Sequence, residues 1–147
     1  MLRKILLFLL AVLVLIQFIP INKEIPEDLV ASDTFYTVNQ VPGNIQNIMD
    51  KACMDCHSYN TEYPWYTAIA PVKFFIQDHI SEGREHLNFD VWASYSDKKA
   101  DHKLEECVEE LEEGEMPLEG YVIMHSDADL SKEEQKELIG YFQSLRK

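Results

Sequence analysis

Cys53-Met54-Asp55-Cys56-His57 forms a C-x-x-C-H pattern about one third of the way along the chain. Residues of these types in this order are typical of covalent haem attachment. Two thiols separated by two residues react with the two vinyl groups of one haem, and the adjoining histidine gives the iron an imidazole ligand. We therefore predict that Cys53 and Cys56 attach a single haem c, and that His57 is the proximal ligand of its iron.

A C-x-x-C pair also occurs in other kinds of site. A redox dithiol of the thioredoxin kind requires a βαβ pattern, which the surrounding sequence lacks. A structural zinc site requires four ligands, and no second C-x-x-C or H-x-x-x-H completes them. A plain disulfide between Cys53 and Cys56 is the third alternative.

Length and charge limit the classes of protein to consider. The 147 residues suffice for one domain and an appendage. The formal net charge of -13, from 26 acidic and 13 basic residues, argues against a nucleic-acid partner. It suits docking to a basic redox partner protein, although the same charge also serves solubility. Three cysteines are too few for a disulfide scaffold.

The N-terminus has the composition of an export or membrane segment. Arg3 and Lys4 precede an unbroken apolar run, Ile5 to Ile16, which Phe18 and Ile19 extend. No small residues follow that would form a cleavage site, so an uncleaved anchor is favoured over a cleaved signal. We predict a signal anchor or transmembrane helix over residues 1–21, which places a single-pass protein in the inner (cytoplasmic) membrane with its haem domain in the periplasm.

The remaining chain divides into a tether over residues 22–43 and a helical domain over residues 44–147. The tether is rich in proline and acid, and its Thr34 to Val38 stretch is predicted to be extended or a short strand. Helical spacing of apolar residues, caps and breakers predict an all-α domain. The predicted helices cover residues 44–57 as one helix bearing both cysteines, residues 71–82 ended or kinked by Gly83, residues 98–113 capped by Asp97, and a last helix opened by a Ser131–Glu134 capping box.

Met116 is the candidate for the sixth iron ligand. It stands in the turn Gly114-Glu115-Met116-Pro117, directly after a predicted helix. A methionine ligand favours ferrous iron. The alternative ligands are Met124, His125, His79, His86 and His102. Cys107 is predicted to be a buried free thiol on the apolar stripe of its helix.

Further residues are candidates for the surroundings of the haem. Because a ligating histidine usually donates its other ring N–H to a fixed acceptor, the carbonyl of Pro64 or Pro71 is a candidate partner of His57. Candidates for the haem wall or for contacts with the haem propionates are Trp65, Tyr66, Arg84 and Trp92.

Several stretches together resemble a known family, the small membrane-anchored bacterial haem-binding domain proteins, related in kind to single-haem cytochromes c. The resemblance covers roughly residues 44–147 and implies an all-helical, cytochrome c-like fold with one haem. The matching stretches are Cys53-Met54-Asp55-Cys56-His57-Ser58, Tyr63-Pro64-Trp65-Tyr66, Ile69-Ala70-Pro71, Glu82-Gly83-Arg84-Glu85, Leu87-Asn88-Phe89 with Trp92, Leu104-Glu105-Glu106 through Gly114-Glu115-Met116-Pro117-Leu118, and Leu130-Ser131-Lys132-Glu133-Glu134.

These observations predict a membrane-anchored periplasmic c-type cytochrome that transfers single electrons, an electron carrier more than an enzyme. No catalytic residues are predicted, because the sequence shows neither a nucleophile with its base nor a pair of carboxylates around a site. A haem-based sensor or gas-binding module is the alternative if Met116 does not ligate. A peroxidase-like enzyme ranks last, with His79, His86 or Arg84 as its distal residue.

Overall fold

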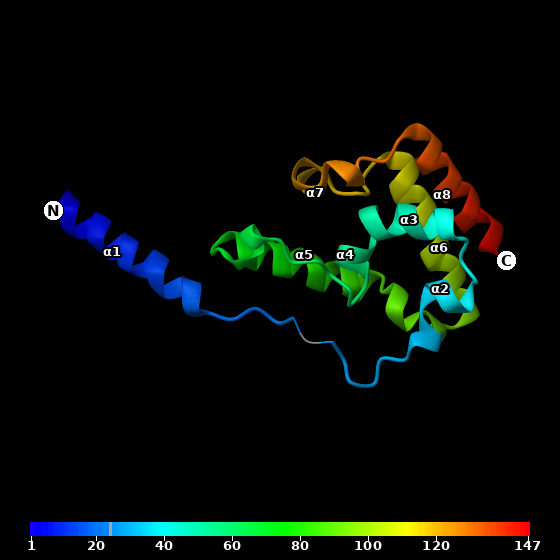
Figure 1. The fold of residues 1–147 in the computed structure, drawn as a ribbon, viewed down its shortest axis with the longest axis horizontal. Helices are drawn as coiled ribbons and strands as arrows, with labels where there is room; N and C mark the ends of the chain where they lie inside the picture. Colours follow the sequence, from blue (N-terminus) through cyan, green and yellow to red (C-terminus); the bar gives the residue numbers. More distant parts are fainter. Residues whose placement is uncertain (24) are drawn as a thin grey trace.

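The computed structural model describes residues 1–23 and 25–147. Within these residues the chain is all-helical, as predicted, and has no β-strand (Figure 1). The α-helices are α1 (Leu2–Leu15), α2 (Phe35–Val38), α3 (Gly43–Ala52), α4 (Met54–His57), α5 (Val72–His86), α6 (Asp97–Glu113), α7 (Glu119–Met124) and α8 (Lys132–Leu145). The 3-10 helices are η1 (Ile16–Phe18), η2 (Ala31–Asp33), η3 (Trp65–Ala68), η4 (Phe89–Ser94) and η5 (Ser126–Ala128).

The N-terminal helix α1 projects away from the rest of the molecule (Figure 1). It has 14 residues, which span about 21 Å at 1.5 Å per residue. The hydrocarbon core of a bilayer is about 30 Å thick. Among the helices in the described part of the chain, none is both long enough and apolar enough to cross a membrane. The structure therefore does not support the transmembrane helix predicted over residues 1–21.

The core lies where α3, α6 and α8 pack together. Helices α6 and α8 lie side by side, and α3 contacts α8. The apolar stripes expected from the sequence point inward, with Leu138 and Phe142 of α8 almost completely buried. This packing forms a rigid base behind the short helix α4, which follows α3 directly. The other buried apolar residues of these helices are Ile45, Ile48, Met49, Ala52, Leu104, Val108 and Leu111.

The second half of the predicted tether is part of the packed domain. The stretch expected to be extended forms α2, capped by Thr34, whose side chain accepts the N–H of Thr37. Phe35 has an exposed fraction of 0 % and its ring centroid lies 4.7 Å from that of Trp92. Burial of a large aromatic ring outweighs the weak local preference for extended backbone.

Three other boundaries differ from the prediction. The helix expected over residues 44–57 breaks at Cys53, whose φ of -128° separates α3 from α4. Helix α5 runs through Gly83 as far as His86. Helix α7 was not expected. The helix predicted over residues 98–113 is confirmed as α6, but its cap is Ser96 and not Asp97, which is the first residue of the helix. The capping box of α8 is confirmed.

Candidate haem-binding site

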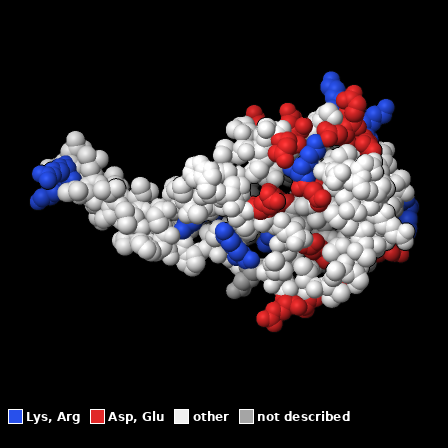
Figure 2. Space-filling view, in the orientation of Figure 1, with Lys and Arg blue, Asp and Glu red and all other residues white. Residues whose placement is uncertain are grey.

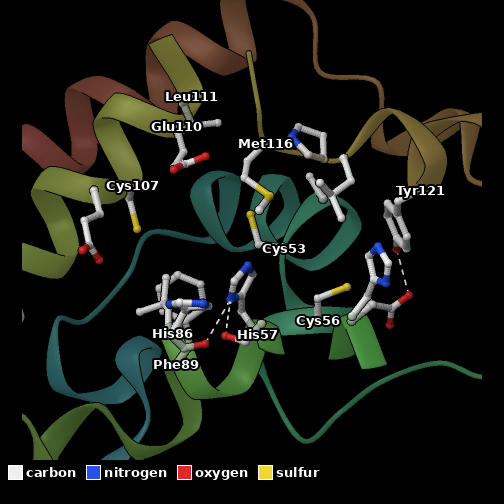
Figure 3. A pocket seen from close by; sticks show the side chains of 18 of the residues that line it. Cys53, Cys56, His57, His86, Phe89, Cys107, Glu110, Leu111, Met116 and Tyr121 are labelled. Carbon is white, nitrogen blue, oxygen red and sulfur yellow. Dashed lines mark hydrogen bonds between the residues drawn. The ribbon is translucent and has the colours of Figure 1, made fainter. Parts of the chain in front are cut away.

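A cavity of about 610 Å³ lies between α4, α5 and α6 and the segment that leads into α7 (Figure 3). Its volume falls within the range of roughly 300–1,000 Å³ typical of ligand and cofactor sites. The structure brings the four predicted haem and iron ligands, Cys53, Cys56, His57 and Met116, into the lining of this one cavity. They come from two stretches of sequence that lie far apart.

The ring of His57 is held by two backbone carbonyls. Its Nδ1 atom lies 3.0 Å from the carbonyl oxygens of both Gly83 and Leu87. Carbonyl oxygens only accept hydrogen bonds, so Nδ1 carries the hydrogen and donates it, and Nε2 keeps its lone pair for a metal. Burial lowers the pKa of His57, which favours the neutral ring that metals bind. The prediction that Pro64 or Pro71 is the acceptor was wrong, because Gly83 in the last turn of α5 and Leu87 directly after that helix supply the carbonyls.

Gly83 allows α5 to approach α4 closely enough for these bonds. A Cβ atom at this position would lie 2.8 Å from the carbonyl oxygen of Cys56. Such a contact is too short for any side chain, so α5 and the C-x-x-C-H helix touch backbone to backbone. The close approach that Gly83 allows therefore determines the position of the Gly83 carbonyl relative to the ring of His57.

The thiols of Cys53 and Cys56 are both free and partly buried at the cavity wall. Burial raises the pKa of Cys53 to about 12 and that of Cys56 to about 11. Reactive dithiols of the thioredoxin kind have lowered values instead. Among the described residues, no group of three or more His, Cys, Asp or Glu residues is arranged to hold a metal ion. These observations favour neither a redox dithiol nor a zinc site.

Met116 faces His57 across the cavity (Figure 3). Helix α6 ends at Gly114 in the left-handed conformation, with φ of 74°. The chain then turns back, and the N–H groups of Glu115 and Met116 donate to the carbonyl of Glu110 at 3.0 and 3.2 Å. This turn carries the Met116 thioether into the cavity.

The alternative iron ligands divide into two groups. His79 and His86 line the cavity from α5, the helix that also supplies the acceptors of His57. Met124, His125 and His102 do not line it. His125 instead bonds Tyr66, and His102 lies near Glu105 and Glu106 on α6.

The three aromatic residues predicted to wall the haem lie outside the cavity lining. Trp92 packs in the core against Phe35. Trp65 is 76 % exposed. The Tyr66 hydroxyl lies 2.9 Å from Nε2 of His125. Closeness to C-x-x-C-H in sequence was a poor guide here, because the chain leaves the site directly after α4.

Arg84, the predicted propionate partner, also lies outside the lining. Its Nε donates to the carbonyl of Ser58 at 2.8 Å and its guanidinium to Thr61 Oγ1 at 2.9 Å. The same guanidinium lies over the ring of Tyr59, 4.8 Å from its centroid. Arg84 thus fastens the segment after C-x-x-C-H to α5.

Several cavity residues were not predicted as site residues. Tyr121 lines the cavity, and its hydroxyl donates to Asp55 at 2.8 Å. Cys107, expected to be buried, is partly exposed at the cavity wall.

The lining includes carboxylates but neither lysine nor arginine. One edge of the acidic face of α6 borders the cavity, which the spacing of residues in the sequence alone does not show. The lining carboxylates are Asp55, Glu82, Glu106, Glu109 and Glu110.

Comparison with known proteins gives one match. The family model described as Haem-binding domain matches residues 11–144. The chain belongs to this family of haem-binding domains. No curated protein and no solved structure matches the chain.

The residues at the cavity fit a haem on the chemistry of the donor set. An imidazole with a free Nε2 and a thioether face each other, and two thiols at C-x-x-C spacing border the same space. His57 and Met116 are the residues that would hold the iron. Cys53 and Cys56 are those that would hold the macrocycle.

Proposed function

We propose that this protein is a c-type cytochrome that carries single electrons with one covalently attached haem. The observation that carries the proposal is the opposition of His57 and Met116 across a cavity bordered by both cysteine thiols. Protein ligands on both sides of an iron leave no position for a substrate. An electron carrier therefore fits this donor set better than an enzyme does.

When bound, haem supplies a one-electron couple at its iron. Cys53 and Cys56 would hold the haem by adding each thiol S–H across a vinyl C=C bond, so that sulfur would bind one carbon and hydrogen the other, with no electrons gained or lost. The raised pKa values of Cys53 and Cys56 keep the thiols protonated before this addition. His57, fixed through Nδ1, presents Nε2. Met116 favours the reduced state, whereas the lining carboxylates favour the oxidised, more positive state.

We propose that the domain works in the periplasm, attached to the cytoplasmic membrane, with a basic protein as its redox partner. The N-terminal segment is apolar and exposed, as an export or membrane segment would be. Acidic side chains gather over the rounded part of the molecule, whereas α1 carries none (Figure 2). A positively charged partner would be steered toward that rounded part.

The test is optical spectroscopy of the full chain made with a haem-attachment system, oxidised and reduced. We expect a c-type spectrum that survives denaturation and is absent from a Cys53→Ser/Cys56→Ser variant. Met116→Ala should remove the weak methionine–iron band near the red end and open the reduced iron to carbon monoxide. Met124→Ala is the matched control, because Met124 is 54 % exposed and does not line the cavity.

The opposite results point to other functions. A wild-type protein that binds carbon monoxide readily, with a spectrum unchanged by Met116→Ala, would indicate a sensor or gas-binding module. Turnover with peroxide in that case would indicate a peroxidase. Absence of covalent haem from the wild-type chain would reject the proposal.

A further inference from the structure

Two stretches that meet in the structure carry only basic charges, although the chain as a whole is strongly acidic. Residues 1–23 and residues 63–76 include none of the 26 aspartates and glutamates. Their charged side chains are all basic: Arg3, Lys4, Lys23 and Lys73. The chain as a whole has a net charge of -13, so these stretches differ in sign from the rest of the molecule.

The two stretches are joined in the structure. The side chain of Gln17 accepts the N–H of Ala70 at 2.9 Å and donates to its carbonyl at 3.2 Å. Lys73 donates to the carbonyls of Gln17 and Ile19 at 2.8 and 2.7 Å. Although charged, Lys73 is only 4 % exposed. The buried ammonium group of Lys73 thus binds backbone carbonyls that lie just after α1, and it holds the N-terminal segment against the start of α5.

An exposed apolar surface lies beside this junction. We name Trp65, Ile69, Val72 and Phe75 the apolar corner; their exposed fractions are 76, 46, 44 and 67 %. Helix α1 next to it has no buried residue. Contiguous exposed apolar surface of this kind marks an interaction site.

We propose that the apolar corner, together with the N-terminal segment, binds the surface of an anionic lipid bilayer. The inference rests on the proposed location at the membrane, and adds that the haem domain itself touches lipid. Apolar side chains and an exposed tryptophan suit the interfacial region. The exposed basic residues of the N-terminal segment, Arg3, Lys4 and Lys23, suit anionic headgroups. A basic redox protein is a poor occupant of this surface, because the charged side chains of residues 1–23, Arg3, Lys4 and Lys23, are exposed and all positive.

This contact would set the orientation of the haem site. Helix α5 starts at the apolar corner with Val72 and first reaches the cavity lining at His79. At 1.5 Å per residue these positions are about 10 Å apart along the helix axis. The acidic part of the molecule would then remain in solution, open to a partner.

The test measures how the haem-loaded full chain partitions between buffer and phosphatidylglycerol vesicles. The protein is diluted from detergent into the vesicles, and the bound fraction is measured by sedimentation. Trp65→Ser/Phe75→Ser should weaken partitioning at least tenfold, and Val72→Ser severalfold. The matched control is Val38→Ser on α2, since Val38 is 45 % exposed and Val72 is 44 % exposed. Binding to phosphatidylcholine vesicles should be clearly weaker.

Several results would overturn the proposal. These are equal partitioning of the double variant and the wild type, equal binding to neutral and anionic vesicles, and self-association through the corner without vesicle binding. The haem spectrum of each variant is recorded in parallel. An altered or missing spectrum would count against the proposed cytochrome function, whereas lost partitioning with an intact spectrum concerns lipid binding alone.

Discussion

At the scale of single residues, Gly83 joins the packing of the fold to the chemistry of the site. It lies inside a helix, where glycine is normally unfavourable relative to alanine. The 2.8 Å contact that a Cβ would make with the Cys56 carbonyl explains its presence. Its own carbonyl is one of the two acceptors of His57.

Gly83→Ala is expected to destabilise the protein by about 1–3 kcal/mol, because α5 must move away from α4. The control is Gly140→Ala inside α8, where an added Cβ meets nothing within 4 Å. That change should stabilise the protein by about 0.5–1 kcal/mol. Both values come from denaturant unfolding. A stable Gly83→Ala protein with an unchanged haem spectrum would show that the close approach is not needed.

The carboxylates at the cavity make a second prediction at this scale. Glu110 lines the cavity, and a negative charge there stabilises oxidised iron. Glu110→Gln should therefore raise the reduction potential measured by redox titration. Glu112→Gln on the same helix removes an equal charge outside the lining and should shift it less. Equal shifts would mean that only the net charge of the protein matters.

At the scale of elements, the first turn of α8 fixes the helix that leads into C-x-x-C-H. Glu134 completes the capping box with Ser131 and pairs with Lys51 of α3 at 2.6 Å. Lys51 stands two residues before Cys53. The start of one helix therefore holds the end of another beside the haem cavity.

The Lys51 ammonium, with Ser131, lowers the pKa of Glu134 from its ordinary 4.5 to about 2. A depressed pKa contributes stability that is present above pH 4.5 and is lost as the pH falls toward 2. Glu134→Gln should therefore be less stable than wild type near neutral pH, and the difference should shrink across that window in unfolding experiments. Glu133→Gln, in the same turn, should show a smaller pH-dependent difference. A Glu134→Gln difference independent of pH would contradict the ion-pair account.

Elements defined by local signals were predicted well, and those defined by distant contacts were not. Helix α6 and helix α8 carry their caps and apolar stripes in their own sequence. Helix α2 depends on burial of Phe35 against η4, far along the chain. The continuation of α5 through Gly83 depends on the backbone of Cys56, which no local pattern displays.

At the scale of the whole molecule, the same distinction applies to the site. Cys53, Cys56 and His57 are adjacent, so their common role is readable from the sequence. Met116 was assigned from its turn after α6, and the fold brings it to the same cavity. The acceptors of His57 lie 26 and 30 residues away in sequence, so proximity along the chain pointed to the wrong carbonyls. The candidate wall residues Trp65, Tyr66, Arg84 and Trp92 lie outside the cavity lining.

The division of the ligands between two stretches of chain also has a consequence for biosynthesis. The thiols, His57 and both of its carbonyl acceptors lie between Cys53 and Leu87, whereas Met116 follows much later. A polypeptide made from its N-terminus therefore contains the residues of the His57 side before Met116 is added. Helix α3 can pack against α8, through the pair of Lys51 and Glu134, only when the last helix has been made, so the complete site forms at the end of synthesis.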